Sequence, residues 1–413
     1  MREMKDSGIE WIGDIPKNWK ITKLKYESSI LYGYPLNSSY FSFDGFPVVR
    51  IRDITSGKIE TYYTGIFPKE YVVTKGDILL GMDGDFNLRE WQNDDAVLNQ
   101  RCCSILGGIG VSKKFLYYAL QGPLKIKNDI TFSTTVKHLL SDGIANICFA
   151  MPNEDLQMII VTFLDQKCSE IDAISEDIQN QITVLEDYKK SIITEAVTKG
   201  LNLDVEMKDS GVDWIGKVPK KWTVIRVGYL LNEIDERSAT GKEQSLSVSQ
   251  KLGIVPSNEI LVPSAASTNK GQKIVKPGQL VLNKLKAHLG VCFVSNYMGL
   301  VSPDYAVYKS NGKVIPKILE YLFHTPQCIW EFKKYITGVG QGLSRLYTND
   351  LFRIKLALPD IQEQDIIVSY LDGKCSEIDS IISDKKKQLE ILAEYKKSLI
   401  YEYVTGKKEV PES

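Results

Sequence analysis

Two long segments of this chain, 207 residues apart, carry nearly the same sequence. Residues 164–198 and 371–405 share 20 identities in 35 aligned positions, among them KCSEID and YKKS. Both segments lack proline and are rich in Ile, Leu, Glu and Lys, which lose little side-chain freedom in a helix. We therefore predict two helices, each a rod of about 52 Å at 1.5 Å per residue.

Apolar residues recur every seven positions along each predicted helix. The first helix carries Leu164, Ile171, Ile178, Leu185 and Ile192, and the second carries Leu371, Ile378, Leu392 and Leu399. The intervening d positions hold Ile174 and Tyr188 in the first copy and Ile381 and Tyr395 in the second. Such a stripe is typical of a coiled-coil seam, so we expect the helices to bury each other and to act as a spacer. The alternative is two separate amphipathic helices, although these usually run only about 8–20 residues.

A second repeat lies at the start of each half. MKDSGIEWIGDIPKNW (4–19) returns as MKDSGVDWIGKVPKKW (207–222), with 11 of 16 positions identical. Each copy is followed by a more divergent region and then by a long helix, so the chain is a tandem repeat. We expect the four segments to be residues 1–153, 154–206, 207–358 and 359–413, in the order domain, helix, domain, helix.

The divergent regions have the pattern of mixed folds rich in strands. Short apolar runs such as FPVVRIRDI, GDILLGM and GQLVLNK are separated by Gly, Pro and Asn, which favours strands joined by turns. Helices are predicted at 112–121 and 316–333. The expected fold class is α+β, with two such domains joined by the long helices.

Composition limits the possible classes of protein. A chain of 413 residues exceeds the usual size of one core. Its net charge of -1 gives no overall sign of a nucleic-acid partner, so a DNA-binding face would have to come from uneven charge distribution or from other subunits. No apolar run is long enough to span a membrane and no signal-peptide core is present, so we expect a cytoplasmic protein. Seven cysteines form no CxxC pair and only three histidines exist, which argues against a metal site.

Motifs for catalysis are weak or missing. No GxxxxGK[ST] is found, Gly338-x-Gly340-x-Gly342 is a lone glycine motif, and Ser302-Pro303-Asp304-Tyr305 has Asp where an adenine methyltransferase loop has its second Pro. Five acids could in principle hold Mg²⁺ as in a nuclease, but the second half has no such cluster, which favours a solvated loop; they are Asp83, Asp85, Glu90, Asp94 and Asp95. We predict no catalytic residue and no cofactor in this chain.

Basic and amide side chains offer candidates for DNA contacts. Residues 261–303 contain five lysines and no acid, a local patch that can neutralise phosphates, while Asn and Gln can read adenine. Arg50 and Arg52 lie two apart and would share one face of a strand. The alternative for each is an ordinary surface ion pair. The candidates are Arg50, Arg52, Asn87, Arg89, Asn99, Gln100, Arg101, Lys270, Lys273, Asn283, Lys284, Lys286 and His288.

The order of these motifs resembles one known family. The duplicated KDSGxxWIGxxPxxW opening, the P-x-x-x-x-Q segment before each helix and the YKKSLI ending look like the specificity subunit of Type I restriction-modification systems. The first half departs from the pattern at NEDLQM, where the second has IQEQDI. The resemblance implies an antiparallel helix pair, a pseudo-twofold repeat, and two target-recognition domains that each read half of a split DNA sequence in the major groove.

The resemblance also implies partners. Double-stranded DNA, two modification (methyltransferase) subunits and restriction subunits are expected to bind, with AdoMet, ATP and Mg on those subunits and not here. Two other classes stay open: a stand-alone enzyme that modifies or cleaves DNA, and a purely structural coiled-coil adaptor. The recognised sequence and spacer length do not follow from the residues.

Overall fold

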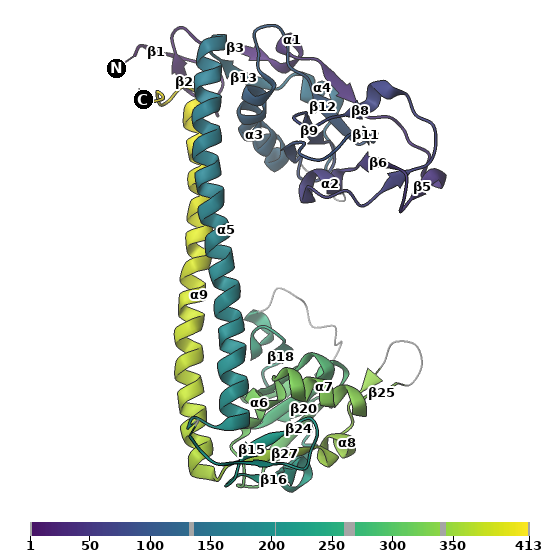
Figure 1. Cartoon of the computed structure of the whole chain (residues 1–413), viewed down its shortest axis with the longest axis vertical. Helices are drawn as coiled ribbons and strands as arrows, with labels where there is room; N and C mark the ends of the chain where they lie inside the picture. The colour runs from purple at the N-terminus through teal and green to yellow at the C-terminus, as the bar shows by residue number, and fades with distance from the viewer. Residues whose placement is uncertain (1, 132–135, 203, 260–268, 339–343, 412–413) are drawn as a thin grey trace. The chain divides into compact units, whose positions relative to one another are not determined.

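The structure, a computed structural model, describes residues 2–131, 136–202, 204–259, 269–338 and 344–411 (Figure 1). Gly340 and Gly342 of the glycine motif lie outside these residues. The chain divides into two compact units: unit 1 comprises Met1–Ile178 and Lys386–Ser413, and unit 2 comprises Gln179–Lys385. Each unit therefore contains one divergent region and one end of both long helices.

Unit 1 is built from short strands and a few helices. Its strands are β1 (Met4–Asp6), β2 (Asp14–Pro16), β3 (Lys20–Lys23), β4 (Ile30–Tyr32), β5 (Phe41–Ser42), β6 (Phe46–Val49), β7 (Tyr62–Tyr63), β8 (Val72–Val73), β9 (Ile78–Gly81), β10 (Leu88–Glu90), β11 (Ala96–Leu98), β12 (Cys102–Ile105) and β13 (Cys148–Met151). Its helices are α1 (Leu24–Glu27), α2 (Ile51–Ser56), α3 (Lys113–Ile130), α4 (Ser141–Ala145) and the start of α5 (Glu154–Lys199).

Unit 2 repeats most of these elements. Its strands are β14 (Met207–Asp209), β15 (Lys217–Pro219), β16 (Thr223–Arg226), β17 (Leu231–Ile234), β18 (Leu246–Ser249), β19 (Gly253–Pro256), β20 (Lys273–Val275), β21 (Leu280–Asn283), β22 (Cys292–Val294), β23 (Gly299–Val301), β24 (Tyr305–Ser310), β25 (Thr337–Gly338), β26 (Ser344–Arg345) and β27 (Lys355–Leu358). Its helices are α6 (Pro316–Phe323), α7 (Pro326–Tyr335), α8 (Thr348–Arg353) and part of α9 (Ile361–Val404), with the 3-10 helix η5 at Lys284–Leu289.

The central sheets of the two units have the same topology. The strand order is β10-β9-β12-β4 in unit 1 and β22-β21-β24-β17 in unit 2, antiparallel throughout. Apolar strand faces and the neighbouring helices enclose each core, in which Phe115 and Phe149 of unit 1 and Phe323 and Phe332 of unit 2 are fully buried. The predicted mixed α/β repeat is confirmed.

The units differ beside this common sheet. Unit 1 adds a five-stranded sheet of order β5-β7-β6-β11-β8, in which β6 runs parallel to β11. Unit 2 has the β18–β19 hairpin in that part of the chain and joins it to β23 by a single parallel bridge between Ser245 and Leu300. Unit 2 also has the antiparallel pair β20–β23, so among the described residues the two units differ here in β5 and in joining these strands into one sheet in unit 1 but into two separate pairs in unit 2.

One predicted helix is divided in two. Residues 316–333 form α6 and α7, because Thr325 caps the second helix by accepting the Cys328 amide (3.4 Å) and Pro326 opens it. Proline lacks the N–H that a continuous helix needs. The predicted helix at 112–121 is confirmed as the first part of α3, which continues to Ile130.

The long helices pair antiparallel in both units, as expected. In unit 1, Asp172 of α5 accepts from Lys396 of α9 (2.6 Å), and the rings of Phe163 and Tyr403 lie 4.6 Å apart. In unit 2, the equivalent ion pair joins Lys189 and Asp379 (2.7 Å). The seven-residue stripe is confirmed as the seam: Leu164, Ile171, Ile178, Leu371, Ile378 and Leu399 are buried, and Leu185, Ile192 and Leu392 are half-buried.

The predicted d positions of the seam were wrong. Ile174, Tyr188, Ile381 and Tyr395 are all exposed. The inward positions instead follow the stripe by four residues, at Cys168 and Ile182 in α5 and at Cys375 and Ile382 in α9. Small thiols fill the seam here, and four larger apolar side chains are left on the outer surface.

A buried glutamine fixes the start of each long helix. The Gln157 side chain accepts from the Ser112 amide (3.1 Å) and donates to the carbonyls of Gly110 and Pro152 (both 3.1 Å). Gln364 makes the same set of bonds, to the Ile315 amide (2.9 Å) and to the carbonyls of Lys313 and Pro359. The departure at NEDLQM therefore leaves this contact intact, since Gln157 is kept.

The opening motifs pack beside the helix ends, but not identically. In unit 2 the buried Trp222 donates from Nε1 to Glu363 (3.1 Å). The equivalent Trp19 is equally buried in unit 1, where Nε1 has no hydrogen-bond partner. Leu156 stands at the position that aligns with Glu363.

The two ends of the described chain meet in unit 1. A guanidinium nitrogen of Arg2 donates to the Gly406 carbonyl (2.5 Å), and Lys407 donates to the Asp14 carbonyl (2.5 Å). Tyr401 adds a bond to the Trp11 carbonyl (3.1 Å). The first opening motif is therefore held by packing against the end of α9.

Candidate nucleic-acid interface

Arg50 and Arg52 do not share a strand face. β6 ends at Val49, and Asp53 accepts the Arg50 amide (2.8 Å), which starts helix α2 with Arg50 as its N-cap. Arg50 stacks over Phe41 with 5.6 Å to the ring centroid, while the exposed Arg52 donates to Thr61 (2.6 Å). The two cations therefore lie at the start of α2, beside β5 and β7 of unit 1, and not on one strand.

Arg89 and Asn87 hold helix α2. The Arg89 guanidinium donates to the carbonyls of Ile54 and of Thr55, the latter at 2.7 Å, where the helix ends. Asn87 donates to the Thr55 hydroxyl (3.0 Å). These contacts satisfy carbonyls that a helix end leaves open, so both side chains have a structural task.

The turn between β11 and β12 presents polar groups. Gln100 and Arg101 are exposed and Asn99 is half-buried. Arg101 lies 3.6 Å from an oxygen of Asp83, whose other oxygen lies 2.7 Å from Nδ1 of His138. The Asp83 carboxylate therefore lies between the side chains of Arg101 and His138, just after the end of β9.

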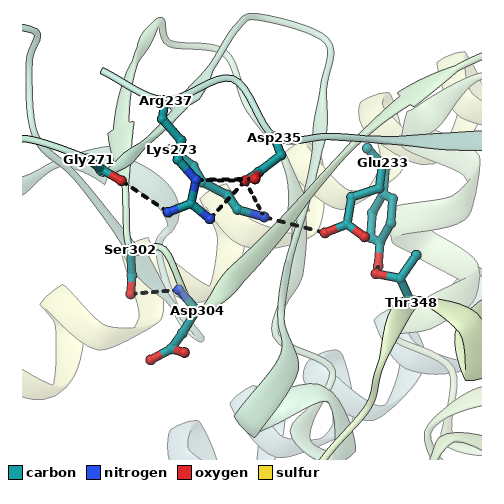
Figure 2. A network of polar contacts seen from close by, with 9 residues as sticks. Glu233, Asp235, Arg237, Gly271, Lys273, Ser302, Asp304 and Thr348 are labelled. Atoms are coloured by element: carbon teal, nitrogen blue, oxygen red, sulfur yellow. Dashed lines mark hydrogen bonds and ion pairs between the residues drawn. The ribbon is translucent and has the colours of Figure 1, made fainter. Parts of the chain in front are cut away.

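Lys273 is not available to DNA, contrary to the prediction. Its side chain is buried, and the ammonium lies 3.4 Å from Glu233 and 3.3 Å from Asp235 (Figure 2). Asp235 also pairs with Arg237 (3.0 Å). A buried charge must be paired in this way. Residues 261–303 contain no acid of their own, and the carboxylates that pair with Lys273 come instead from β17 and the residue after it.

Asn283 is likewise structural. It is buried at the end of β21 and accepts the amides of Leu285 and Lys286 (3.1 and 3.2 Å), which caps η5. An amide occupied by its own backbone cannot pair bidentately with adenine. Of the remaining candidates in unit 2, Lys286 and Lys270 are exposed and His288 is half-buried.

Lys284 is half-buried among charged neighbours. Burial, and to a smaller extent the nearby cations Lys273 and Arg345, lower the pKa of Lys284, although Glu233 and Asp304 act in the opposite direction. Arg345 lies 3.4 Å from Asp304. An anion such as a phosphate beside Lys284 would reduce the repulsion between Lys284, Lys273 and Arg345.

The charged groups occupy equivalent places in the two units. The Leu139 amide bonds to the Met82 carbonyl just after β9 (2.8 Å), and the Leu346 amide bonds to the Lys284 carbonyl just after β21 (3.0 Å). We call the surroundings of this bond the corner site: Asp83, Arg101 and His138 in unit 1, and Lys284, Asp304 and Arg345 in unit 2. Sequence reasoning missed His138 and Arg345. The two residues align with each other at the same offset of 207 residues that relates the long helices.

The described residues contain no cluster of His, Cys, Asp and Glu side chains arranged to hold a metal ion. Among the same residues, no helix is long and apolar enough to cross a bilayer. In the parts of the chain that the structure describes, Cys102 and Cys103 are buried, and burial raises the pKa of the Cys103 thiol to about 12.

Two copies of one α/β frame, each with a different charged corner and different added strands, define a tandem recognition scaffold. The chain belongs to the family of the Type I restriction modification DNA specificity domain, whose family model matches residues 16–184 and 219–391. It is a specificity subunit of this kind with two target-recognition domains.

Relatives match over nearly their whole length. The Type I restriction enzyme EcoBI specificity subunit of Escherichia coli is 24% identical over 420 residues, which cover 92% of this chain and 84% of that protein. The MjaVIII specificity subunit of Methanocaldococcus jannaschii is 22% identical over 95% of this chain and 93% of that protein. A chain from a solved structure of a type I R-M system shares the fold, with a TM-score of 0.68 at 16% identity, over 95% of this chain and 99% of that chain.

Proposed function

We propose that each unit reads one part of a bipartite DNA target, and that the paired helices set the distance between the two parts. The observation that carries this proposal is the contrast within the repeat: the central sheet and the glutamine contact are the same in both units, while the corner sites and the added strands differ. Two domains with the same fold but different exposed side chains are suited to recognise two different DNA sequences. We expect the subunit to work in the cytoplasm.

Phosphate contacts would come from the exposed cations of each unit. In unit 1 these are Arg52 and Arg101, and in unit 2 they include Lys286, with the half-buried Lys284 beside it. Base contacts would come from exposed amides such as Gln100, since side-chain amides pair with adenine in the major groove. Asn99 and His288, both half-buried, stay candidates at the edges of these surfaces.

The outer face of the helix pair suits the modification subunits. Ile174, Ile391 and Tyr395 are exposed in unit 1, and Ile381, Val184 and Tyr188 are exposed in unit 2 at the aligned positions. Two equivalent apolar sets would receive two copies of the same partner. AdoMet would bind to those subunits, and ATP and Mg to the restriction subunits.

An exchange of units tests the proposal. Residues 20–150 are replaced by the corresponding region of another family member, and the methylated sequence is determined by methylome sequencing with the cognate partners. One half of the recognised sequence should change and the other should stay. A simultaneous change in both halves would contradict separate reading. AdoMet binding or Mg²⁺-dependent cleavage by the isolated chain would support the alternative of a stand-alone enzyme.

A helix insertion tests the spacing. Four residues added after Ile182 lengthen α5 by about 6 Å and turn the following part by about 40°, while base pairs rise by about 3.4 Å each. The preferred spacer should lengthen by roughly two base pairs, or methylation should fall. Unchanged spacing with unchanged activity would show that the helices do not measure the gap.

A further inference from the structure

A hydrogen bond from a tyrosine to an aspartate joins the globular region of each unit to the side of a long helix. In unit 1 the hydroxyl of Tyr118, on α3, donates to the Asp165 carboxylate of α5 (2.6 Å). In unit 2 the hydroxyl of Tyr321, on α6, donates to the Asp372 carboxylate of α9 (2.5 Å). The tyrosines are 203 residues apart, like the opening motifs, and the aspartates are 207 apart, like the long helices. The contact therefore belongs to the repeat.

Both tyrosines remain hydrogen-bond donors. Their side chains are buried, and burial, followed by the bond to the aspartate, raises the pKa of Tyr118 and of Tyr321. A hydroxyl that donates to a carboxylate at this distance forms a short, charge-assisted hydrogen bond, which is stronger than a neutral one. Each unit therefore has a directional bond between its globular region and its long helix.

The tyrosine hydroxyls also lie at the seam of the helix pair. Cys168, buried in the seam one turn after Asp165, lies beside the Tyr118 hydroxyl and near Lys396 of α9. The same arrangement is found in unit 2, where the corresponding residues are Cys375, Tyr321 and Lys189. Each hydroxyl is therefore placed where the two long helices pack together, so it holds the pair and not one helix alone.

A second contact along a helix fixes the direction of the helix as well as its position. Gln157 and Gln364 hold the starts of α5 and α9, and the aspartates follow them by eight residues, which is about 12 Å. A rod held at one point can tilt, whereas two points at this separation fix its line. A slip of about 1 Å at the second contact would move the end of α5, roughly 63 Å beyond Gln157, by about 5 Å. That displacement exceeds the rise of one base pair, about 3.4 Å.

The aspartate has additional support in unit 1 only. There, the ammonium of Lys114 on α3 lies 3.3 Å from the Asp165 carboxylate. At the aligned position of unit 2, Lys317 pairs instead with Glu320 of its own helix (2.5 Å). Among the described residues, the tyrosine hydroxyl is then the side-chain partner of Asp372. Loss of the tyrosine hydroxyl should therefore have the larger effect in unit 2.

We infer that Tyr118 and Tyr321 are positioning residues: each sets the direction in which its target-recognition domain holds the helix pair, and together they restrict the spacer lengths that the complex accepts. The inference rests on the proposed reading of a bipartite target, and it assigns part of the spacing to two side chains. Neither hydroxyl has to touch DNA for this effect, because both tyrosines are buried and act through the aspartates.

A panel of duplexes with different spacers tests the positioning role. The chain is assembled with its cognate modification subunits, and methylation rates are measured on duplexes whose spacer has the cognate length or is one base pair longer or shorter. Tyr321→Phe removes the hydroxyl and keeps the ring, so the preference for the cognate spacer should fall about fivefold, a factor typical of one lost hydrogen bond. Tyr118→Phe should show a smaller fall, because Lys114 still holds Asp165.

Tyr308→Phe is the matched control. The buried Tyr308 also loses a hydroxyl bond, but its partner is Thr348 (3.0 Å), so the bond joins β24 to α8 and does not reach a long helix. This variant should lose stability and keep the spacer preference of the wild type. Asp372→Asn retains an oxygen acceptor for the tyrosine and should keep most of the preference, whereas Asp372→Leu should behave like Tyr321→Phe.

Two results would overturn the inference. One is an unchanged spacer preference in the assembled Tyr321→Phe complex, including an equal loss of rate on all three duplexes. The other is an equal fall in preference in Tyr308→Phe, which would make the effect one of general stability. If the wild-type complex instead methylated all three duplexes equally well, the proposed reading of a bipartite target with a fixed spacer would itself be wrong.

Discussion

The two units keep the same internal contacts and differ where they face outward. Gln157 and Gln364 make the same three bonds, and the ion pairs of Lys396 with Asp172 and of Lys189 with Asp379 fall at aligned positions. Each corner site holds one Arg–Asp ion pair, but its third group differs, being His138 in unit 1 and Lys284 in unit 2. The contacts that hold the frame are thus common to both units, and the residues that differ between the units are the candidates for recognition under the proposed function.

The glutamine contact should show the largest effect. Gln157→Leu and Gln364→Leu each leave one buried amide and two carbonyls without a partner, which should cost about 3 kcal/mol of unfolding free energy. Urea unfolding with hydrogen exchange should show the loss in unit 1 for the first variant and in unit 2 for the second. Gln166→Leu, on the exposed side of α5, should change stability by less than about 0.5 kcal/mol. Clearly different losses of unfolding free energy in Gln157→Leu and Gln364→Leu would show that the two glutamine contacts are not equivalent.

The corner of unit 2 should be visible in the salt dependence of DNA binding. Lys284→Ala combined with Lys286→Ala should weaken binding about tenfold, or about 1.4 kcal/mol, and reduce the salt slope by roughly one to two. Lys276→Ala is the control, since Lys276 lies in the same run but pairs with Glu236 (2.7 Å). An unchanged slope in the double variant would assign both lysines to the solvated surface.

The smallest effect is expected at the tryptophans. Leu156→Glu gives the unpaired Trp19 Nε1 the partner that Trp222 has, and should raise the stability of unit 1 by about 1 kcal/mol. The reverse change, Glu363→Leu, should lower that of unit 2 by a similar amount. Thermal unfolding followed by tryptophan fluorescence measures both. Equal signs for the two variants would show that the indole bond is not what distinguishes the junctions.

Local sequence patterns predicted the helices and the repeat, but only part of the seam. The seven-residue stripe was correct because Leu164 and its equivalents are both apolar and inward. The second inward position was assigned to Ile174 because it is larger and more apolar, whereas the helix turns Cys168, for which burial of a small thiol was also expected, into the seam. At Arg50 the apolar run suggested a strand, yet Asp53 supplies the acceptor that begins a helix.

The candidate site depended on contacts that sequence spacing does not reveal. Lys273 looked free because its carboxylate partners lie about forty residues earlier, at Glu233 and Asp235. Strand pairing brings them together, and such pairing is not encoded in any short segment. Arg101 was found from its residue type, whereas His138 became visible only through its 2.7 Å contact with Asp83.

The division of the chain has a consequence for the order of folding. Unit 2 is one continuous segment, Gln179–Lys385, whereas unit 1 needs residues from both ends of the chain. On the ribosome, the seam of unit 2 can close as soon as its own residues emerge, but Leu164 and Ile171 must wait for Leu399 and its neighbours, which follow the whole of unit 2 in the chain. Closing so long a loop is slow and leaves apolar surface exposed meanwhile. Unit 1 therefore begins to emerge before unit 2 and is completed after it, so its apolar surface stays uncovered for longer during synthesis.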